Sequence, residues 1–269
     1  MSLLSAHGVC RLYARAALVG ARQTRQALDT VSINIDAGET IALLGRSGCG
    51  KSTLARILAG LETPDSGEVR FNGCPLASLR RQERTTFRRS VQMVFQDSFS
   101  AVDPRRTIGE SLAEPLRHLL GLDGRACMKR TGDLLLRVGL EPRDAAKLPQ
   151  QMSGGQLQRV CIARALAPEP RLVILDEAVS NVDLHLQLQL LALFEALRRD
   201  MNVAYLFVTH DLRLAERFSS RIVVMDEGRV CEEAAVMRPL QLTTPAGKAL
   251  QDAILPAMPA RRGLFYSAC

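Results

Sequence analysis

The sequence predicts an α/β fold whose core is a largely parallel sheet, with an N-terminal antiparallel β subdomain and an inserted α-helical subdomain. Short apolar runs alternate with stretches of helical periodicity in the second half of the chain, which is typical of parallel strands linked by crossover helices. Between Phe95 and Leu172 this alternation stops, and leucines recur at helical spacing instead. We therefore expect a parallel sheet that carries a helical insertion.

The individual strands follow from local patterns. Val31–Ile35 alternates apolar and polar residues, as a half-buried strand does, and Thr40–Leu44 is a fully apolar strand. A helix is expected over Leu54–Leu61, after a glycine-rich loop. Further strands are expected at Gly67–Phe71, Val91–Phe95, Leu172–Leu175, Val203–Val208, Ile222–Met225 and Arg229–Glu232. Asn72 and Gly73 together are typical of a hairpin turn.

The same patterns suggest the domain organisation. One domain is expected over residues 1–239, with its helical subdomain at about 98–167 and a further helix at Leu184–Arg199. Residues 240–269 form a proline-punctuated C-terminal tail, which is a candidate for contact with a partner.

Composition narrows the class of protein. The 269 residues are 47% hydrophobic, which is ample for a core, and the formal net charge is +7. The basic residues are dispersed and the aromatic residues form no stacking pattern among them, so a solvated basic face is favoured over a nucleic-acid surface. Apolar runs stay short of the roughly 18 residues of a membrane-spanning helix, and the N-terminus lacks a signal-peptide layout. These features predict a cytoplasmic protein without a span of its own.

A phosphate-binding loop occupies the stretch GRSGCGKST, between the expected Thr40–Leu44 strand and the following helix. It fits the pattern G-x-x-x-x-G-K-[ST], in which glycines let backbone N–H groups converge on phosphate oxygens. The lysine of this pattern reaches the β- and γ-phosphates, and the serine after it binds Mg²⁺. The residues expected to contact the nucleotide are Gly45, Arg46, Ser47, Gly48, Cys49, Gly50, Lys51, Ser52 and Thr53.

Two adjacent acids end the apolar stretch LVILDE. We expect Asp176 to hold Mg²⁺ through water, together with Ser52, as in P-loop nucleotide hydrolases. Glu177 comes one residue later, so its side chain points elsewhere and is available to polarise a water toward the γ-phosphate.

A second candidate anion site lies in QMSGGQLQRV, where Ser153, Gly154, Gly155 and Gln156 open an expected helix. These four residues resemble the signature sequence of the ABC-transporter ATPases, and the resemblance extends over about Leu3–Glu232. The family's other motifs are matched in order by Tyr13 (the aromatic that stacks on adenine), Gln96 (the Q-loop), Asp183 (the D-loop) and His210 (the switch histidine). Met152 departs from the usual leucine before the signature, and we expect this volume-conserving change to be tolerated.

The resemblance implies a P-loop NTPase core that uses ATP and Mg²⁺ at the interface of a head-to-tail dimer. The signature residues of one subunit would close over the γ-phosphate held by the P-loop of its partner. Glu177, His210 and Gln96 are the implied catalytic residues, and Gln96 also joins Ser52 and Asp176 as a metal ligand.

Two segments resemble the ATPases of peptide and nickel importers: the loop Gln96–Arg105 and the tail segment Pro245–Pro259. This resemblance implies the ATP-binding subunit of an importer, with nickel as the expected solute. The implied partners are a second, related ATPase subunit, two transmembrane permeases docked near the loop after Gln96, and an extracytoplasmic solute-binding protein. The implied location is the cytoplasmic face of the inner membrane. The alternatives are a di- or oligopeptide import ATPase and a non-transport ABC ATPase that acts on nucleic acid or ribosomes.

Overall fold

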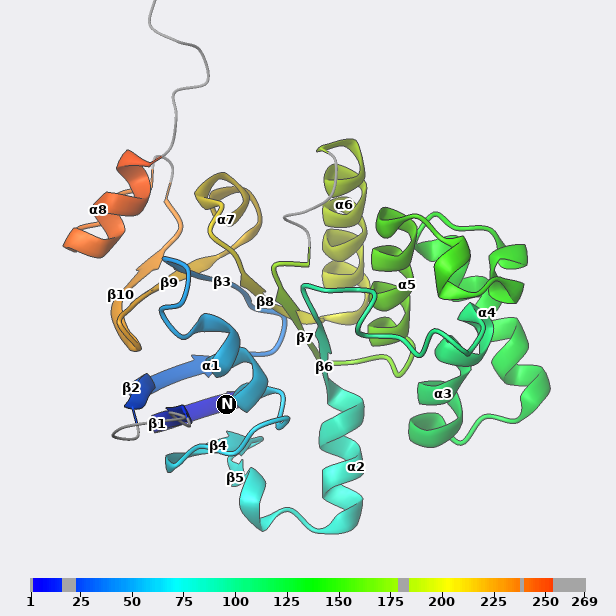
Figure 1. The fold of residues 1–269 in the computed structure, drawn as a ribbon, viewed down its shortest axis with the longest axis horizontal. Coiled ribbons are helices and arrows are strands. Elements are labelled where there is room, and N and C mark those ends of the chain that lie inside the picture. The colour runs from blue at the N-terminus through cyan, green and yellow to red at the C-terminus, as the bar shows by residue number, and fades with distance from the viewer. Residues whose placement is uncertain (1, 16–22, 179–183, 238–239, 254–269) are drawn as a thin grey trace, which may run out of the picture.

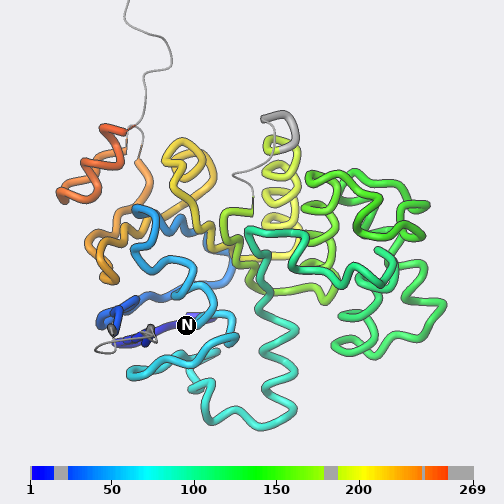
Figure 2. The backbone as a smooth tube through the Cα atoms, in the orientation of Figure 1, coloured from blue at the N-terminus to red at the C-terminus, as the bar shows by residue number. Residues whose placement is uncertain are grey.

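The computed structural model describes residues 2–15, 23–178, 184–237 and 240–253 of the chain. Its strands form two sheets, and its helices lie around them (Figure 1). The backbone tube shows the helical insert standing to one side of the strands, at the end away from the N-terminal sheet (Figure 2).

The larger sheet of the described chain has six strands in the order β10-β9-β3-β8-β7-β6. These strands are β3 (Thr40–Gly45), β6 (Val91–Val94), β7 (Leu172–Asp176), β8 (Ala204–Val208), β9 (Arg221–Asp226) and β10 (Arg229–Ala235). Neighbouring strands run parallel, except β9 and β10, which form an antiparallel pair. The predicted α/β class with a largely parallel sheet is confirmed.

The smaller sheet is antiparallel and has the strand order β2-β1-β4-β5. It contains β1 (Leu4–Arg15), β2 (Gln23–Ile35), β4 (Ser66–Phe71) and β5 (Cys74–Pro75). The register of β1 and β2 pairs Leu4 with Ile35 at one end and Tyr13 with Arg25 toward the other. Asn72 and Gly73 have φ angles of 48° and 81°, so they form the predicted tight turn between β4 and β5. This sheet is the expected N-terminal β subdomain.

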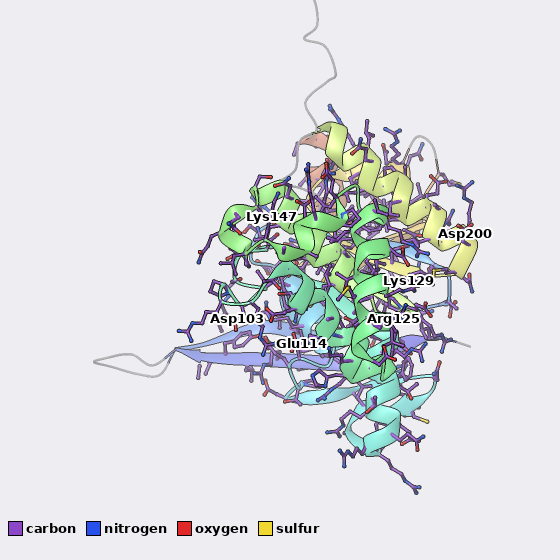
Figure 3. The ribbon with its side chains drawn as sticks, turned by 90° about the vertical axis from the view of Figure 1, so that its right-hand side faces the viewer. Asp103, Glu114, Arg125, Lys129, Lys147 and Asp200 are labelled. Carbon is purple, nitrogen blue, oxygen red and sulfur yellow. The ribbon has the colours of Figure 1, made fainter. Side chains whose placement is uncertain are left out.

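Four helices accompany the sheets: α1 (Lys51–Leu58), α6 (Leu184–Met201), α7 (Leu212–Phe218) and α8 (Pro245–Asp252). The helical insert contains α3 (Ile108–Leu120), α4 (Gly124–Arg137) and α5 (Gly154–Leu166), with 3₁₀ turns at Pro142–Ala146 and Pro149–Gln151. Charged side chains cover the outer side of the insert, among them Arg125 and Lys129 of α4 (Figure 3). The remaining elements are a 3₁₀ turn at Leu76–Ser78 and α2 (Arg81–Ser90), which leads into β6.

The central strands β3, β7 and β8 of the larger sheet are buried on both faces. Val173 and Leu175 of β7 belong to one hydrophobic core with α6 and the helical insert, whereas Leu172 and Ile174 face a second core with α1 and the smaller sheet. Met152 is buried in the first of these cores, so the methionine before the signature fills a packing position. Each face of the strand is apolar because each meets a different layer.

Several elements differ from the sequence-based expectations or were not among them. No strand was expected at β1, and β2 begins at Gln23 rather than at Val31. The helix expected over Leu54–Leu61 runs from Lys51 to Leu58, because its first turn starts inside the glycine-rich loop. The basic run 80–89 forms most of α2, whose arginines are exposed while Phe87 is buried. The tail contains α8, and the buried residues Leu240 and Leu242 pack with β3 and β9.

Candidate functional site

The glycine-rich loop connects β3 to α1 in a backbone shape that side chains would obstruct. Gly45, Gly48 and Gly50 have φ angles of 155°, 79° and 107°. A Cβ on Gly45 would lie 2.3 Å from the carbonyl oxygen of Met225, and one on Gly50 would lie 2.3 Å from that of Ala27. Only glycine fits these positions, and the loop therefore forms a cradle lined by backbone.

Lys51 is the first residue of α1, and its side chain turns back into the loop. Its Nζ donates hydrogen bonds of 2.8 Å to the carbonyl oxygen of Gly45 and 2.9 Å to that of Arg46. The residue is only 6% exposed, so the ammonium sits within the loop rather than in bulk solvent. Combined with the positive end of α1, this places cationic character where a polyphosphate would be held.

Cys49 is buried in the same loop, next to the lysine. Burial raises the pKa of the Cys49 thiol, and the ammonium of Lys51 opposes that effect. A buried thiol with a raised pKa is a poor nucleophile, so this cysteine fills space in a tight loop.

Ser52 and Asp176 form a pair of oxygen donors at the end of β7. The Oγ of Ser52 donates a 3.0 Å hydrogen bond to Oδ1 of Asp176, which is 5% exposed. Burial raises the pKa of Asp176, the hydrogen bond from Ser52 lowers it, and the neighbouring Glu177 raises it further. A divalent cation would compensate this buried carboxylate, and hydroxyl and carboxylate oxygens are ligands that Mg²⁺ accepts. The donor set therefore fits a magnesium ion.

Glu177 leaves the strand in a different direction from Asp176. Its φ of 49° lies in the left-handed region, which is uncommon for a residue with a side chain, and its N–H bonds to the carbonyl oxygen of Val208 at 2.9 Å. Its carboxylate accepts a 2.7 Å hydrogen bond from Nε2 of Gln96 and lies 3.4 Å from Nδ1 of His210. The ends of β6, β7 and β8 thus bring three of the predicted catalytic residues together.

His210 lies two residues after the end of β8, and its side chain is 63% exposed. The next residue, Asp211, caps α7 by accepting hydrogen bonds from the backbone N–H groups of Arg213 and Leu214, at 2.9 and 3.2 Å. This cap fixes the start of α7, so the loop holds the exposed imidazole close to the carboxylate of Glu177.

The signature residues lie elsewhere in the same chain. Ser153 caps α5, with a 3.2 Å hydrogen bond from the N–H of Gln156 to its Oγ and one of 3.0 Å from its own N–H to Oε1 of Gln156. A Cβ on Gly154 would meet no atom within 4 Å, so its surface is open. In Figure 1, α5 and α1 lie on opposite sides of β6 and β7. The structure does not bring the signature to the P-loop of its own chain.

Tyr13 lies near the end of β1, across from Arg25 in the register. The guanidinium of Arg11 lies over its ring, 5.1 Å from the centroid, and its hydroxyl donates a 2.5 Å hydrogen bond to Glu62. The role of Tyr13 in stacking on adenine stays a prediction. Asp183, the predicted D-loop residue, lies outside the described residues.

Two further residues contact this region without having been predicted. Nη2 of Arg25 donates a 2.7 Å hydrogen bond to the carbonyl oxygen of Gly48 in the P-loop. Gln158 is buried, and its Nε2 donates a 2.8 Å hydrogen bond to the carbonyl oxygen of Ala178, next to Glu177. Neither residue carried a sequence signal: Arg25 lies outside the motifs, and Gln158, two residues after the signature, is one of several polar residues there.

None of the described helices is long and apolar enough to cross a membrane. Over the same described ranges, no group of three or more His, Cys, Asp and Glu side chains is arranged to hold a metal ion. The oxygen donors at Ser52 and Asp176 are a different kind of site, whose chemistry fits a cation that also binds phosphate.

A P-loop, an adjacent buried carboxylate, a glutamate held between a glutamine and a histidine, and a capped signature helix define an ABC-type ATPase. The sequence profile of the family described as "ABC transporter" matches residues 28–180. The chain belongs to the ABC transporter family.

Comparison with individual proteins shows which ABC ATPases the chain is similar to. The chain is 56% identical to the nickel import ATP-binding protein NikE of Rhodospirillum rubrum over 258 residues, which cover 96% of this chain and 93% of the relative. It is 52% identical to NikE of Escherichia coli (strain K12) over 262 residues, with coverage of 97% and 98%. The solved dimeric, post-hydrolysis ATP-binding cassette MJ0796, bound to ADP and Pi, is 31% identical with a TM-score of 0.78, covering 87% of this chain and 99% of that one. The predicted resemblance to the ATPases of nickel importers is confirmed.

Proposed function

We propose that this chain is the ATP-hydrolysing subunit of a nickel importer. The observation that carries the proposal is the cluster of Gln96, Glu177 and His210 beside the P-loop, in a chain that closely resembles nickel import ATP-binding proteins over nearly its whole length. Nickel is the cargo of the assembled importer and takes no part in the chemistry of this subunit.

The nucleotide would be held by the backbone cradle of Gly45–Thr53, by the ammonium of Lys51 and, at the base, by Tyr13. Ser52, Asp176 and Gln96 would hold Mg²⁺, which supplies charge neutralisation on the phosphate oxygens when bound. Lys51 already lies inside the cradle, 2.8 Å from the carbonyl oxygen of Gly45, so a small displacement brings its charge to a phosphate.

Glu177 has the geometry of a base that orients and deprotonates a water. Its carboxylate is held by the amide of Gln96 at 2.7 Å and by the imidazole of His210 at 3.4 Å, whereas the carboxylate of Asp176 accepts a hydrogen bond from Ser52. The two adjacent acids can take different roles because their surroundings differ. Asp176 ends the strand and accepts a hydrogen bond from Ser52, whereas Glu177 has a backbone φ in the left-handed region.

The exposed signature at Ser153–Gln156 suggests that a second subunit completes the site. Its hydroxyl and amide groups are arranged as a helix cap, and they face open space in the single chain. In a head-to-tail pair, this helix start would meet the γ-phosphate on the partner's P-loop and stabilise its charge. The pairing subunit is a second copy or a related ATPase, and Asp183 belongs to the same proposed interface.

A groove between the antiparallel sheet, α2 and the helical insert is a suitable docking place for the permeases. Its volume is about 770 Å³, and its walls are mainly apolar, with Phe87 of α2, the exposed Leu61 and Phe95, and Leu119 of α3. It adjoins the loop after Gln96, so an apolar helix from a permease loop would sit close to the catalytic cluster. We infer that docking there would hold the subunit peripherally at the cytoplasmic face of the membrane, with an extracytoplasmic solute-binding protein completing the system.

The test is ATPase activity of the chain purified with the transmembrane permeases that co-purify with it and reconstituted in lipid vesicles. Nickel ion with the solute-binding protein should stimulate phosphate release and drive nickel into the vesicles. Stimulation by dipeptides or oligopeptides instead of nickel would reassign the cargo. Stimulation by DNA or ribosomes in the absence of permeases would overturn the transport function.

A further inference from the structure

Gln158 is a buried amide in the middle of α5, with a relative exposure of 6%. Its Nε2 donates a 2.8 Å hydrogen bond to the carbonyl oxygen of Ala178, and its Oε1 accepts one from Oγ of Ser98. An amide at this depth needs partners for its donor and its acceptor, and here they come from two different loops. One side chain thus joins the loop after β6, helix α5 and the loop after β7.

Each of the three joined segments carries a functional group. Ser98 follows the glutamine Gln96 by two residues, and Ala178 directly follows Glu177. The signature serine Ser153, which caps the start of α5, precedes Gln158 by five residues. The side chain of Gln158 therefore connects the loop that carries Gln96, the segment after Glu177 and the helix capped by Ser153. Its hydrogen bonds do not reach the P-loop.

The loop after β6 is fastened to α5 at two more points. Nη1 of Arg164 donates a 2.6 Å hydrogen bond to the carbonyl oxygen of Ala101, and Sγ of Cys161 lies 3.6 Å from the carbonyl oxygen of Ser98. Ala101, Cys161 and Arg164 also line the apolar groove between α2 and the helical insert. A segment that enters this groove would therefore press on the loop and on the helix that Gln158 connects.

We propose that Gln158 is a positioning residue that transmits docking in the groove to the backbone of Glu177. This inference rests on the proposed function and specifies how the groove communicates with the base. A shift of Ser98 moves the amide of Gln158, and the amide moves the carbonyl of Ala178. Glu177 responds because its strained left-handed backbone is adjacent and its N–H has a single partner at Val208, 2.9 Å away.

The test compares two serines of one loop in the reconstituted transporter. Ser98→Ala removes the donor to Gln158 and leaves the bond to Ala178 in place. Ser100→Ala is the matched control, because its Oγ bonds to the carbonyl oxygen of Asp97 within the loop, at 3.2 Å. The measured quantity is the ratio of permease- and cargo-stimulated to basal kcat, with the KM for ATP determined in parallel.

Ser98→Ala should lower the stimulation ratio by roughly five- to tenfold, the range of a modest allosteric coupling, with the KM for ATP unchanged. Ser100→Ala should keep the ratio of the unmodified protein. Gln158→Leu should lower kcat by roughly tenfold or more at unchanged KM, because it also releases Ala178. Equal ratios in Ser98→Ala and Ser100→Ala would overturn the proposal. Absence of ATPase activity in the unmodified complex would instead overturn the proposed function.

A second measurement uses the isolated full-length chain and does not depend on the permeases. Hydrogen exchange of the Glu177 amide, which donates to Val208, should accelerate in Ser98→Ala and in Gln158→Leu but not in Ser100→Ala. Unchanged protection of this amide in both bridge variants, in chains that keep the melting temperature of the unmodified protein, would also refute the role of Gln158.

Discussion

Replacing Glu177 by glutamine removes a base while keeping the shape of the site. The glutamine side chain has nearly the same volume, and its carbonyl oxygen can accept the 2.7 Å hydrogen bond that Nε2 of Gln96 now donates to the carboxylate. The contact with His210 at 3.4 Å is also compatible with an amide. Lys51 bonds to the carbonyl oxygen of Gly45 and Ser52 bonds to Asp176, so the substitution leaves these hydrogen bonds of the nucleotide cradle intact.

The expected magnitude follows from the role of a positioned base. General-base catalysis contributes about 10²- to 10⁴-fold, which corresponds to roughly 2.7–5.4 kcal/mol at 1.36 kcal/mol per tenfold change. Glu177→Gln should therefore lower kcat for phosphate release by at least about a hundredfold, while the Kd for ATP stays within about threefold. Because ATP binds but is not cleaved, a nucleotide-linked dimer should accumulate and be visible by size-exclusion chromatography.

Glu227 supplies a matched control for this experiment. It also has a left-handed backbone, with a φ of 43°, but it lies in the turn between β9 and β10 and has no contact with Gln96 or His210. Glu227→Gln should leave kcat unchanged. A kcat of Glu177→Gln within about tenfold of the unmodified protein would show that another group activates the water, and our assignment of the base would fail.

Three further predictions concern affinity and stability. Lys51→Ala should weaken ATP binding by roughly ten- to a hundredfold, the value of a charge-assisted hydrogen bond, and equilibrium titration with a fluorescent ATP analogue measures it. Tyr205→Phe should raise the free energy of unfolding by up to about 1 kcal/mol in urea titrations, because the buried hydroxyl has no hydrogen-bond partner among the described residues; a loss of stability would reveal a partner. Burial alone would raise the pKa of Glu232, but hydrogen bonds from Thr244 and Thr243 lower it from 4.5 to about 2. The ionised Glu232 therefore stabilises the folded protein fully above its unfolded-state pKa, and this stabilisation is lost as the pH falls from about 4.5 toward 2. Glu232→Gln should lower the free energy of unfolding by about 1 kcal/mol at pH 7. It should also remove this part of the acid dependence of the free energy of unfolding.

Much of the fold could be predicted because its parallel strands are buried on both faces. Runs such as Leu172–Leu175 have no polar residue and end at charged or glycine positions, so their type and place were clear from the sequence. β1 was not predicted, because Leu4–Arg15 mixes polar, charged and small residues and pairs through several bulges. α8 and α2 were missed for a similar reason: one is a short helix in a proline-rich tail, and the other buries little more than Phe87.

The parts of the site that could be predicted are those whose backbone conformation is determined by a local sequence motif. The P-loop and the Asp176-Glu177 pair follow fixed strand ends, so local sequence determines their positions. Arg25 could not be predicted, because its contact with Gly48 depends on the register of β1 and β2. The bridge at Gln158 depends on two loops whose meeting point is set by tertiary packing and leaves no local pattern.

The packing of the tail against the sheet limits where the chain can be shortened or fused to another protein. Leu240 and Leu242 are buried against Ala42, Leu44 and Val224, and Glu232 fastens the start of α8 through Thr244. A protein shortened after residue 239 would leave an apolar strip of β3 and β9 in contact with water, which favours precipitation on expression. Fusion partners and affinity tags therefore belong beyond residue 253, where the last described helix has ended.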